Sequence, residues 1–521
     1  MAIELFAAID VGSFELELGI YEMSEKIGIR EIQHLRHVLA LGRDTYNDGK
    51  ISFELVEEMC GVLQDFTEEM KAYKVTKYKA YASSALREAK NNQIVLDQIF
   101  VRTGLRVSPI NNSELRFMSY KAVAAHTEEF QQTVQMGTAI IEVGFGSSQI
   151  SLFDKDVLVS TQNILLGSLR ISEMASHWQI NYSQVPGVIE ELVENELHTF
   201  KKMYLKDRMI KNLIVTGESI LYLAKRGTRS VMQNHFTADE FNEFYKEIIL
   251  MSVDEIEEYY EMDYDYASVM IPSAIIYKKV MDMTGAESIW IPGIRLCDGI
   301  AAEYADENHL VKFYHDFTGD ILSSARSIAK RYKCHTAHTQ EMERLVVMIF
   351  NATKRFHGLG DRERLLLQIS AILHASGKFV SIMKGTDSSY QIIMATEIIG
   401  ISHLEREIVA NVVRYNMQEY AYNQVALNAG LSQYKGIDAS GRDITILIAK
   451  LTAILRLANS MDRSHNQKLS DCKMAVKGEN LVITTGYIGN MVLEQSSFEQ
   501  KADFFEEIFG IRPILKQKRR V

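Results

Sequence analysis

The chain of 521 residues has little cysteine and proline, and it lacks long apolar runs. Its four cysteines, Cys60, Cys297, Cys334 and Cys472, lie far apart without Cys-x-x-Cys spacing, which predicts a reduced protein and not a disulfide scaffold. No apolar run approaches the roughly 18 residues of a membrane span, and acidic residues interrupt the N-terminal segment early. We therefore expect a cytoplasmic protein that neither inserts into a membrane nor is secreted.

An excess of basic charge is also missing. Lys and Arg number 57 against 68 Asp and Glu, which gives a formal net charge of −11. Such a chain repels polyanions at long range, so nucleic acid is not an expected partner. A phosphorylated substrate would need locally gathered basic residues or a metal cation.

What the chain does contain is a pair of similar turns, each of which follows an apolar strand and an acidic residue. The first segment reads Phe6-Ala7-Ala8-Ile9-Asp10-Val11-Gly12-Ser13, and the second reads Glu142-Val143-Gly144-Phe145-Gly146-Ser147-Ser148-Gln149. A carboxylate in this position suits Mg²⁺, and glycine lets backbone amides approach phosphate oxygens. An ordinary tight connection would explain either turn alone, but the repetition favours two related lobes that grip one phosphorylated ligand.

These turns supply most of the candidate site residues. We expect Asp10 and Glu142 to bind the metal ion. The candidate phosphate-binding residues of the turns are Gly12, Ser13, Gly144, Gly146, Ser147 and Ser148.

Two further side chains suit phosphate chemistry. Arg87 could place its planar guanidinium on a phosphate, although a surface arginine at a helix start is the simpler interpretation. Glu114 is the only carboxylate between Val107 and Ala125, and it is the candidate general base that activates water. An acid that interacts favourably with the N-terminal end of a helix is the alternative for Glu114.

The distribution of patterns predicts four domains. Strand and helix patterns alternate through two α/β lobes, which we place at residues 1–127 and 128–305. Helical periodicity, as in Leu365, Leu366, Ile369, Ile372 and Leu373, fills residues 306–470. Residues 471–521 form a small α+β tail, with expected strands at 480–485 and 491–494 and a helix that opens with Ser496-x-x-Glu499 and closes at Gly510.

Histidines in the helical region do not form a convincing metal site. His374 lies on an apolar helix face, where a packed histidine is the more ordinary explanation. The cluster of Cys334, His335 and His338 lacks a fourth ligand at useful spacing, so zinc is not expected.

Taken together, these segments resemble the exopolyphosphatase and guanosine pentaphosphate phosphohydrolase (Ppx/GppA) family. The resemblance implies two actin- or sugar-kinase-like (ribonuclease H-like) lobes followed by an HD-like helical domain. Besides the two turns, the similar segments are Ser84-Ala85-Leu86-Arg87-Glu88-Ala89-Lys90-Asn91, Leu166-Gly167-Ser168-Leu169-Arg170, Gly293-Ile294-Arg295, Ala371-Ile372-Leu373-His374 and Phe504-Phe505-Glu506-Glu507-Ile508-Phe509-Gly510.

The resemblance implies Mg²⁺-dependent removal of the terminal phosphate from inorganic polyphosphate or from guanosine pentaphosphate, with guanosine tetraphosphate as a further ligand. It also implies a glutamate that assists water, within a Glu-Glu-Ala-Arg segment that reads Asn112-Ser113-Glu114-Leu115-Arg116 here. A homodimer is the expected assembly, with the helical domain either forming its surface or extending the binding channel.

Departures from the family pattern gather at the expected chemistry. Phe14 and Glu15 stand where the family has Asn-Ser, Glu142 replaces Asp, Phe145 replaces a glycine and Gln149 replaces Glu. If position 145 requires positive φ, phenylalanine would be strained there. In the HD-like domain, Ala375 and Asn416 stand at ligand positions, so a second hydrolytic centre is not expected.

Three functions follow from these observations. The first is an exopolyphosphatase-like phosphohydrolase, and the second is a weakened or inactive member that binds polyphosphate or a guanosine alarmone as a regulatory protein. A sugar-kinase-like phosphotransferase is the third, because it shares the two-lobe fold.

Overall fold

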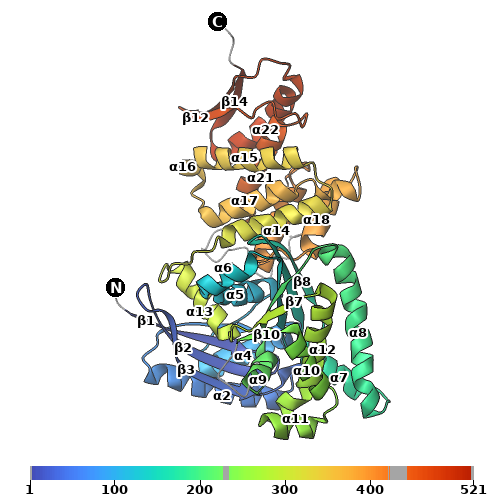
Figure 1. The fold of residues 1–521 in the computed structure, drawn as a ribbon. Helices are drawn as coiled ribbons and strands as arrows, with labels where there is room; N and C mark the ends of the chain where they lie inside the picture. The colour runs from blue at the N-terminus through green and yellow to red at the C-terminus, as the bar shows by residue number, and fades with distance from the viewer. Residues whose placement is uncertain (1–2, 227–233, 421, 423–442, 518–521) are drawn as a thin grey trace. The chain divides into compact units, whose positions relative to one another are not determined.

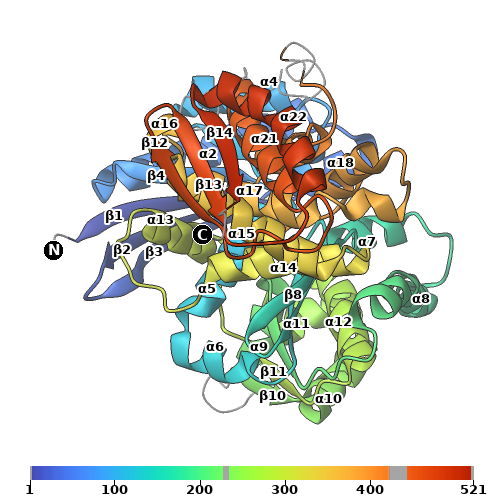
Figure 2. The ribbon, with the colours of Figure 1, turned by 90° about the horizontal axis from the view of Figure 1, so that it is seen from above.

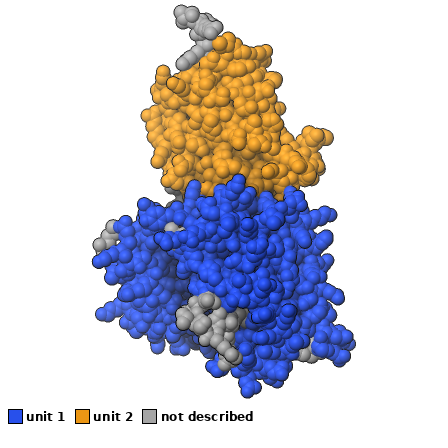
Figure 3. Space-filling view, viewed as in Figure 1, with its two compact units in different colours: residues 1–316 blue, residues 317–521 orange. Residues whose placement is uncertain are grey.

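The computed structural model describes residues 3–226, 234–420, 422 and 443–517. The chain divides into two compact units, Met1–Asp316 and Phe317–Val521, which Figure 3 distinguishes by colour. The first unit contains two mixed sheets with helices around them (Figure 1). The second unit is mainly helical and ends in a small sheet.

The two sheets of the first unit share one plan. In each, two strands continue from the central strand as an antiparallel meander on one side, and parallel strands follow on the other. The second sheet has one further, antiparallel strand at the edge of its parallel side. The first sheet has the order β3 (Gly28–Val38), β2 (Glu15–Ser24), β1 (Glu4–Val11), β4 (Lys77–Ala82), β5 (Val107–Pro109). The second has the order β10 (His235–Thr237), β11 (Ser288–Trp290), β9 (Asn212–Thr216), β6 (Thr138–Val143), β7 (Ser148–Asp154), β8 (Val157–Ile164). This repetition confirms the two-lobe architecture expected from the paired turns.

The central strands form where apolar residues can be buried on both faces. In β1, Phe6, Ala7, Ala8 and Ile9 are fully buried, as expected for a strand covered on both sides. The helices that surround the sheets are α1 (Leu41–Asp48), α2 (Phe53–Ala72), α3 (Ser84–Glu88), α4 (Asn92–Thr103), α5 (Asn112–Ala125), α6 (Thr127–Val134), α7 (Ser168–Ser176), α8 (Val185–Phe200), α9 (Glu218–Arg226), α10 (Ala238–Ile248), α11 (Val253–Tyr260), α12 (Tyr264–Thr284) and α13 (Leu296–Glu307).

Helix α13 follows the last strand of the second sheet but packs on the first sheet. Its buried residues Cys297, Ile300 and Ala301 share a hydrophobic cluster with Phe6 and Ala8 of β1. The second lobe therefore ends its own core before α13, and this helix completes the core of the first lobe.

The second unit is built from helices whose buried faces repeat at helical spacing. These helices are α14 (Phe317–Arg331), α15 (Thr336–Ala352), α16 (Lys354–His357), α17 (Asp361–Leu373), α18 (Gly385–Ala395), α19 (His403–Arg414) and α21 (Ile444–Met461). Helix α21 is long and apolar enough to cross a membrane, but 78% of it is buried inside the protein, as is typical of a core helix.

The tail contains a three-stranded sheet, β12 (Lys473–Lys477), β13 (Asn480–Thr485) and β14 (Arg512–Gln517), shown in Figure 2. The predicted strand at 491–494 is wrong, because α22 (Val492–Phe509) already begins there. Burial of Glu494, Phe498 and Phe505 on one helix face, with Glu494 ion-paired to Lys468 at 2.9 Å, favours the helix. Ser496 therefore lies inside α22 and does not open it, whereas Gly510 does cap its end with φ 65°.

Candidate functional site

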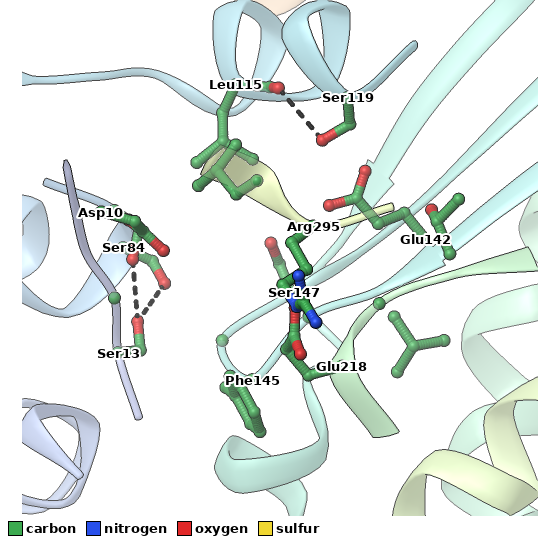
Figure 4. A pocket seen from close by; sticks show the side chains of 18 of the residues that line it. Asp10, Ser13, Ser84, Leu115, Ser119, Glu142, Phe145, Ser147, Glu218 and Arg295 are labelled. Carbon is green, nitrogen blue, oxygen red and sulfur yellow. Dashed lines mark hydrogen bonds between the residues drawn. The ribbon is translucent and has the colours of Figure 1, made fainter. Parts of the chain in front are cut away.

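A cavity of about 90 Å³ lies where the two lobes meet. It is lined from the first lobe by the β1–β2 turn, α3 and α5, and from the second lobe by the β6–β7 turn and the β9–α9 turn. Asp10 and Glu142 both line it, and Figure 4 shows them on opposite sides. The predicted phosphate residues in the lining are Gly12, Ser13, Gly144, Gly146 and Ser147.

Asp10 ends β1 with its side chain at the cavity and is only 8% exposed. Its Oδ1 atom has no hydrogen-bond partner. Burial, reinforced by the negative charge of Glu15 and opposed by Arg116, raises the pKa of Asp10 to about 8. The Asp10 carboxyl is thus a buried oxygen donor that gains from a nearby cation.

Glu142 is in a different state, because the guanidinium of Arg116 forms an ion pair with it. Arg116 lies on α5, is 8% exposed, and also donates from Nη2 to the Ser147 carbonyl at 3.2 Å. Since Arg116 is fixed by two groups of the second lobe, it joins α5 to the β6–β7 turn.

Mg²⁺ bound by Asp10 and Glu142 was the expected metal site. Asp10 fits this role, since it presents an unpartnered carboxyl oxygen. Glu142 does not fit it while Arg116 neutralises its carboxylate. Gln149, which is opposite Glu142 in the β6–β7 register, uses its Nε2 to donate to Ser151 at 3.3 Å and lines a small neighbouring cavity instead.

The Ser13 hydroxyl of the first turn interacts with the hydroxyls of Tyr46 on α1 and Ser84 on α3. Ser13 Oγ lies 2.8 Å from Ser84 Oγ, and the Tyr46 hydroxyl lies 3.1 Å from both. Ser13 Oγ also accepts a hydrogen bond from the Ala85 amide at 3.0 Å. Gly146 of the second lobe approaches this cluster so closely that a Cβ there would lie 2.2 Å from Ser84 Oγ and from the Tyr46 hydroxyl oxygen.

The two phenylalanines that depart from the family pattern pack against each other across the lobes. The rings of Phe14 and Phe145 stack with centroids 4.4 Å apart, and Phe14 meets Tyr266 edge-on at 5.0 Å. Phe14 is fully buried in the hydrophobic cluster of the second lobe. Phe145 is not among the described non-glycine residues with positive φ, so the strain considered for it is not present. The two substitutions together form an aromatic contact between the turns of the two lobes.

Three predicted site residues do not line the cavity. Glu114 occupies the third position of α5, where its backbone amide donates to the Asn111 side chain at 2.9 Å and its carboxylate accepts from the Asn111 amide. Arg87 donates to the Ile110 carbonyl at 2.7 Å, and the Ser148 hydroxyl donates to the Leu166 carbonyl. The placement of Glu114 matches the helix-terminus alternative, and Asn111-x-x-Glu114 is a capping-box signal that the sequence already contained.

The cavity also contains charged residues that were not predicted as part of the site. Besides Arg116, these are Arg295, Glu15, Glu17 and Glu218. The sequence signal for two of them is the pair Glu15 and Glu17, which alternates with Leu16 and Leu18 at the start of β2, because alternate residues of a strand face the same side. For Arg116 the signal is helical spacing, since Asn112, Arg116 and Ser119 lie on one face of α5.

A second polar cluster lies in the helical unit. His338 Nδ1 is 2.8 Å from Asp462 Oδ2, and its Nε2 is 3.1 Å from Nε2 of His374. Burial lowers the pKa of His374 to about 3, so this ring is neutral and packed.

Two lobes of like topology, with paired acid–glycine turns at one cavity, define the actin-like two-lobe fold. The model of the Ppx/GppA phosphatase family matches residues 20–307, and that of Ppx/GppA phosphatase domain III matches residues 322–502. The chain therefore belongs to the Ppx/GppA phosphatase family, whose members include phosphohydrolases.

Relatives carry both names of the family. A guanosine-5'-triphosphate,3'-diphosphate pyrophosphatase of Photobacterium profundum is 21% identical over 92% of this chain and 91% of its own length. The solved exopolyphosphatase of Cytophaga hutchinsonii is 17% identical with a TM-score of 0.51, covering 60% of this chain and 99% of that one. The Aquifex aeolicus family member is 19% identical with a TM-score of 0.50, covering 59% and 100%. These structures share the fold of about three fifths of this chain.

Proposed function

We propose that the cavity binds the terminal phosphate of inorganic polyphosphate or of a guanosine penta- or tetraphosphate together with Mg²⁺, and that the chain is a regulatory family member with slow or absent hydrolysis. The observation that carries this proposal is the face of α5 toward the cavity, which presents Asn112, Leu115, Arg116 and Ser119 and no carboxylate. The expected water-activating Glu114 caps the helix instead.

The size and charge of the cavity support binding of a phosphate end. A volume of about 90 Å³ is sufficient for a phosphoryl group together with a cation or a few waters. The carboxylates of the lining repel phosphate, so a bound cation is needed for affinity. Arg295 is the other basic residue of the lining beside Arg116.

Hydrolysis remains the second candidate function, because Asp10 is placed for it. This carboxyl ends β1, lines the cavity and has an oxygen without a hydrogen-bond partner. Held beside a phosphate end, it would orient water or the cation while the closed lobes supply positioning.

A paired assay distinguishes these functions. Thermal stability of the full chain with Mg²⁺ is measured with and without polyphosphate or guanosine pentaphosphate, and phosphate release is measured under the same conditions. We expect stabilisation with little or no release. Release that Asp10→Asn abolishes would establish the hydrolase, and neither stabilisation nor release would reject both functions.

Gln149→Glu tests whether the site is a decayed enzyme, with Gln149→Asn as an uncharged control. A carboxylate opposite Glu142 competes for Arg116 and leaves Glu142 more available to Mg²⁺. A gain of phosphate release in the glutamate variant alone would show that this ligand acid limits catalysis.

A further inference from the structure

Three glutamates from the two lobes converge at the cavity. Glu15, Glu17 and Glu218 each place one carboxylate oxygen within 4.8 Å of the others. Glu15 and Glu17 are two residues apart on β2 and therefore face the same side of the sheet, whereas Glu218 is the first residue of α9 in the second lobe. Across the described part of the chain, no other group of three acidic, histidine or cysteine side chains meets this spacing.

The glutamates of β2 are buried with oxygens that lack partners. Glu15 is 3% and Glu17 is 2% exposed, and Oε1 of each accepts no hydrogen bond. The other carboxylate oxygen of Glu15 accepts from the Tyr266 hydroxyl. His34 Nε2 lies 3.4 Å from Glu17 Oε1 without hydrogen-bond geometry.

Asp10 adds an independent observation. It belongs to β1, is paired in register with Glu17 of β2, and so lies on the same face of the sheet. Its side chain is 8% exposed, lines the same cavity, and leaves Oδ1 without a partner. Four carboxyl groups from three elements thus share one buried space.

The neighbouring arginines have other contacts. Arg36 lies over the rings of Tyr222 and Tyr266, with its guanidinium carbon 5.5 Å and 5.0 Å from their centroids. Arg295 pairs with Glu31 at 3.2 Å. Arg36 and Arg295 lie close enough to offset part of the negative charge of the glutamates. Buried like charges that are only partly compensated remain costly to the fold, and a bound cation would relieve this cost.

We propose that Glu15, Glu17 and Glu218, with Asp10 beside them, bind one hard divalent cation (Mg²⁺, Mn²⁺ or Ca²⁺) that joins the two lobes. Oxygen-only ligands select this class of ion, and the remaining coordination positions are open to water or to an anion. The inference goes beyond the proposed function, because the cation binds without any phosphate ligand. In this proposal the glutamates of β2 and α9 take the place of Glu142 as metal ligands, because Glu142 is ion-paired to Arg116.

The test is metal binding to the full chain after chelator treatment and without phosphate. Addition of Mg²⁺, Mn²⁺ or Ca²⁺ alone is expected to raise the Tm in a saturable manner. Electron paramagnetic resonance of added Mn²⁺ is expected to report one tight site per chain. In Glu218→Gln, the Tm without metal is expected to rise, because repulsion among the carboxylates is relieved. The metal affinity of this variant is expected to fall about tenfold or more.

Glu22→Gln is the matched control, since Glu22 lies on β2 with Glu15 and Glu17 but does not line the cavity. It is expected to keep the metal affinity of the unmodified chain within about twofold. If Glu218→Gln does not fold, Glu17→Gln is measured in its place. The proposal is overturned if the unmodified chain binds none of the three ions at millimolar concentration, or if the cluster variants bind them as the unmodified chain does.

Discussion

Phe14→Ala is the substitution that best tests how the lobes are held together. The ring lies in the turn between β1 and β2, yet it is fully buried in the hydrophobic cluster of the second lobe and stacks on Phe145. Removing it leaves a cavity between the lobes that neither backbone can fill without moving. We therefore expect a large loss of stability in the first unit.

The magnitude follows from core substitutions in other proteins. Truncating a fully buried phenylalanine to alanine costs about 3–5 kcal/mol. Unfolding entropy of roughly 2.1 cal/mol/K per residue gives about 0.66 kcal/mol/K for the unit Met1–Asp316. A loss of about 4 kcal/mol therefore lowers the Tm of this unit by roughly 6 °C. The stacked geometry adds a coupling of about 0.5–1.5 kcal/mol between Phe14 and Phe145.

Urea unfolding and thermal scans of the single and double alanine variants measure both quantities. Phe53→Ala is the control, because its ring is 64% exposed and its removal is expected to cost less than about 1 kcal/mol. A loss below about 1 kcal/mol in Phe14→Ala, or strictly additive effects of Phe14→Ala and Phe145→Ala, would refute an aromatic contact that holds the lobes closed.

Two further predictions concern buried charge. Arg116→Ala leaves the Glu142 carboxylate without its ion-pair partner and is expected to lower the free energy of unfolding, measured in urea, by about 3–5 kcal/mol. Adding Glu142→Gln is expected to recover much of this loss. If the double variant recovers no stability, the ion pair is not the cause of the loss. Burial raises the pKa of Glu407 from 4.5 to about 7, so the folded state binds its proton more tightly and this group lowers stability as pH rises from 4.5 to above 7. The free energy of unfolding of Glu407→Gln, relative to that of the unmodified chain, should therefore increase by up to about 3 kcal/mol across that pH range. If the difference between the two proteins does not depend on pH, Glu407 titrates normally.

The sequence identified the lobes because their pattern is local. An apolar strand that is buried on both faces, followed by an acid and small residues, is visible at Phe6–Ser13 and again at residues 139–148. It did not show that α13 packs on β1, because this contact joins residues nearly three hundred positions apart. The apolar run at 491–494 was mistaken for a strand because short apolar runs do not distinguish strand from helix.

Within the site, the turns placed Asp10, Ser13 and Gly146 at the shared cavity as their pattern suggested. The sequence alone could not show the partner of Glu142, since Arg116 reaches it only after α5 packs against the second lobe. Nor could it show that Phe14 and Phe145 compensate each other. Each looks unfavourable beside a phosphate, and their mutual packing becomes visible only when the two turns face each other.

The return of α13 to the first sheet decides how the chain can be divided. A fragment that stops at the end of the second sheet would strip β1 of its covering helix and expose Phe6 and Ala8 to water. Expressing either lobe by itself would therefore yield aggregation-prone material. Dissection at Asp316–Phe317 keeps this helix with its sheet, so recombinant fragments for separate biochemical study should begin or end there.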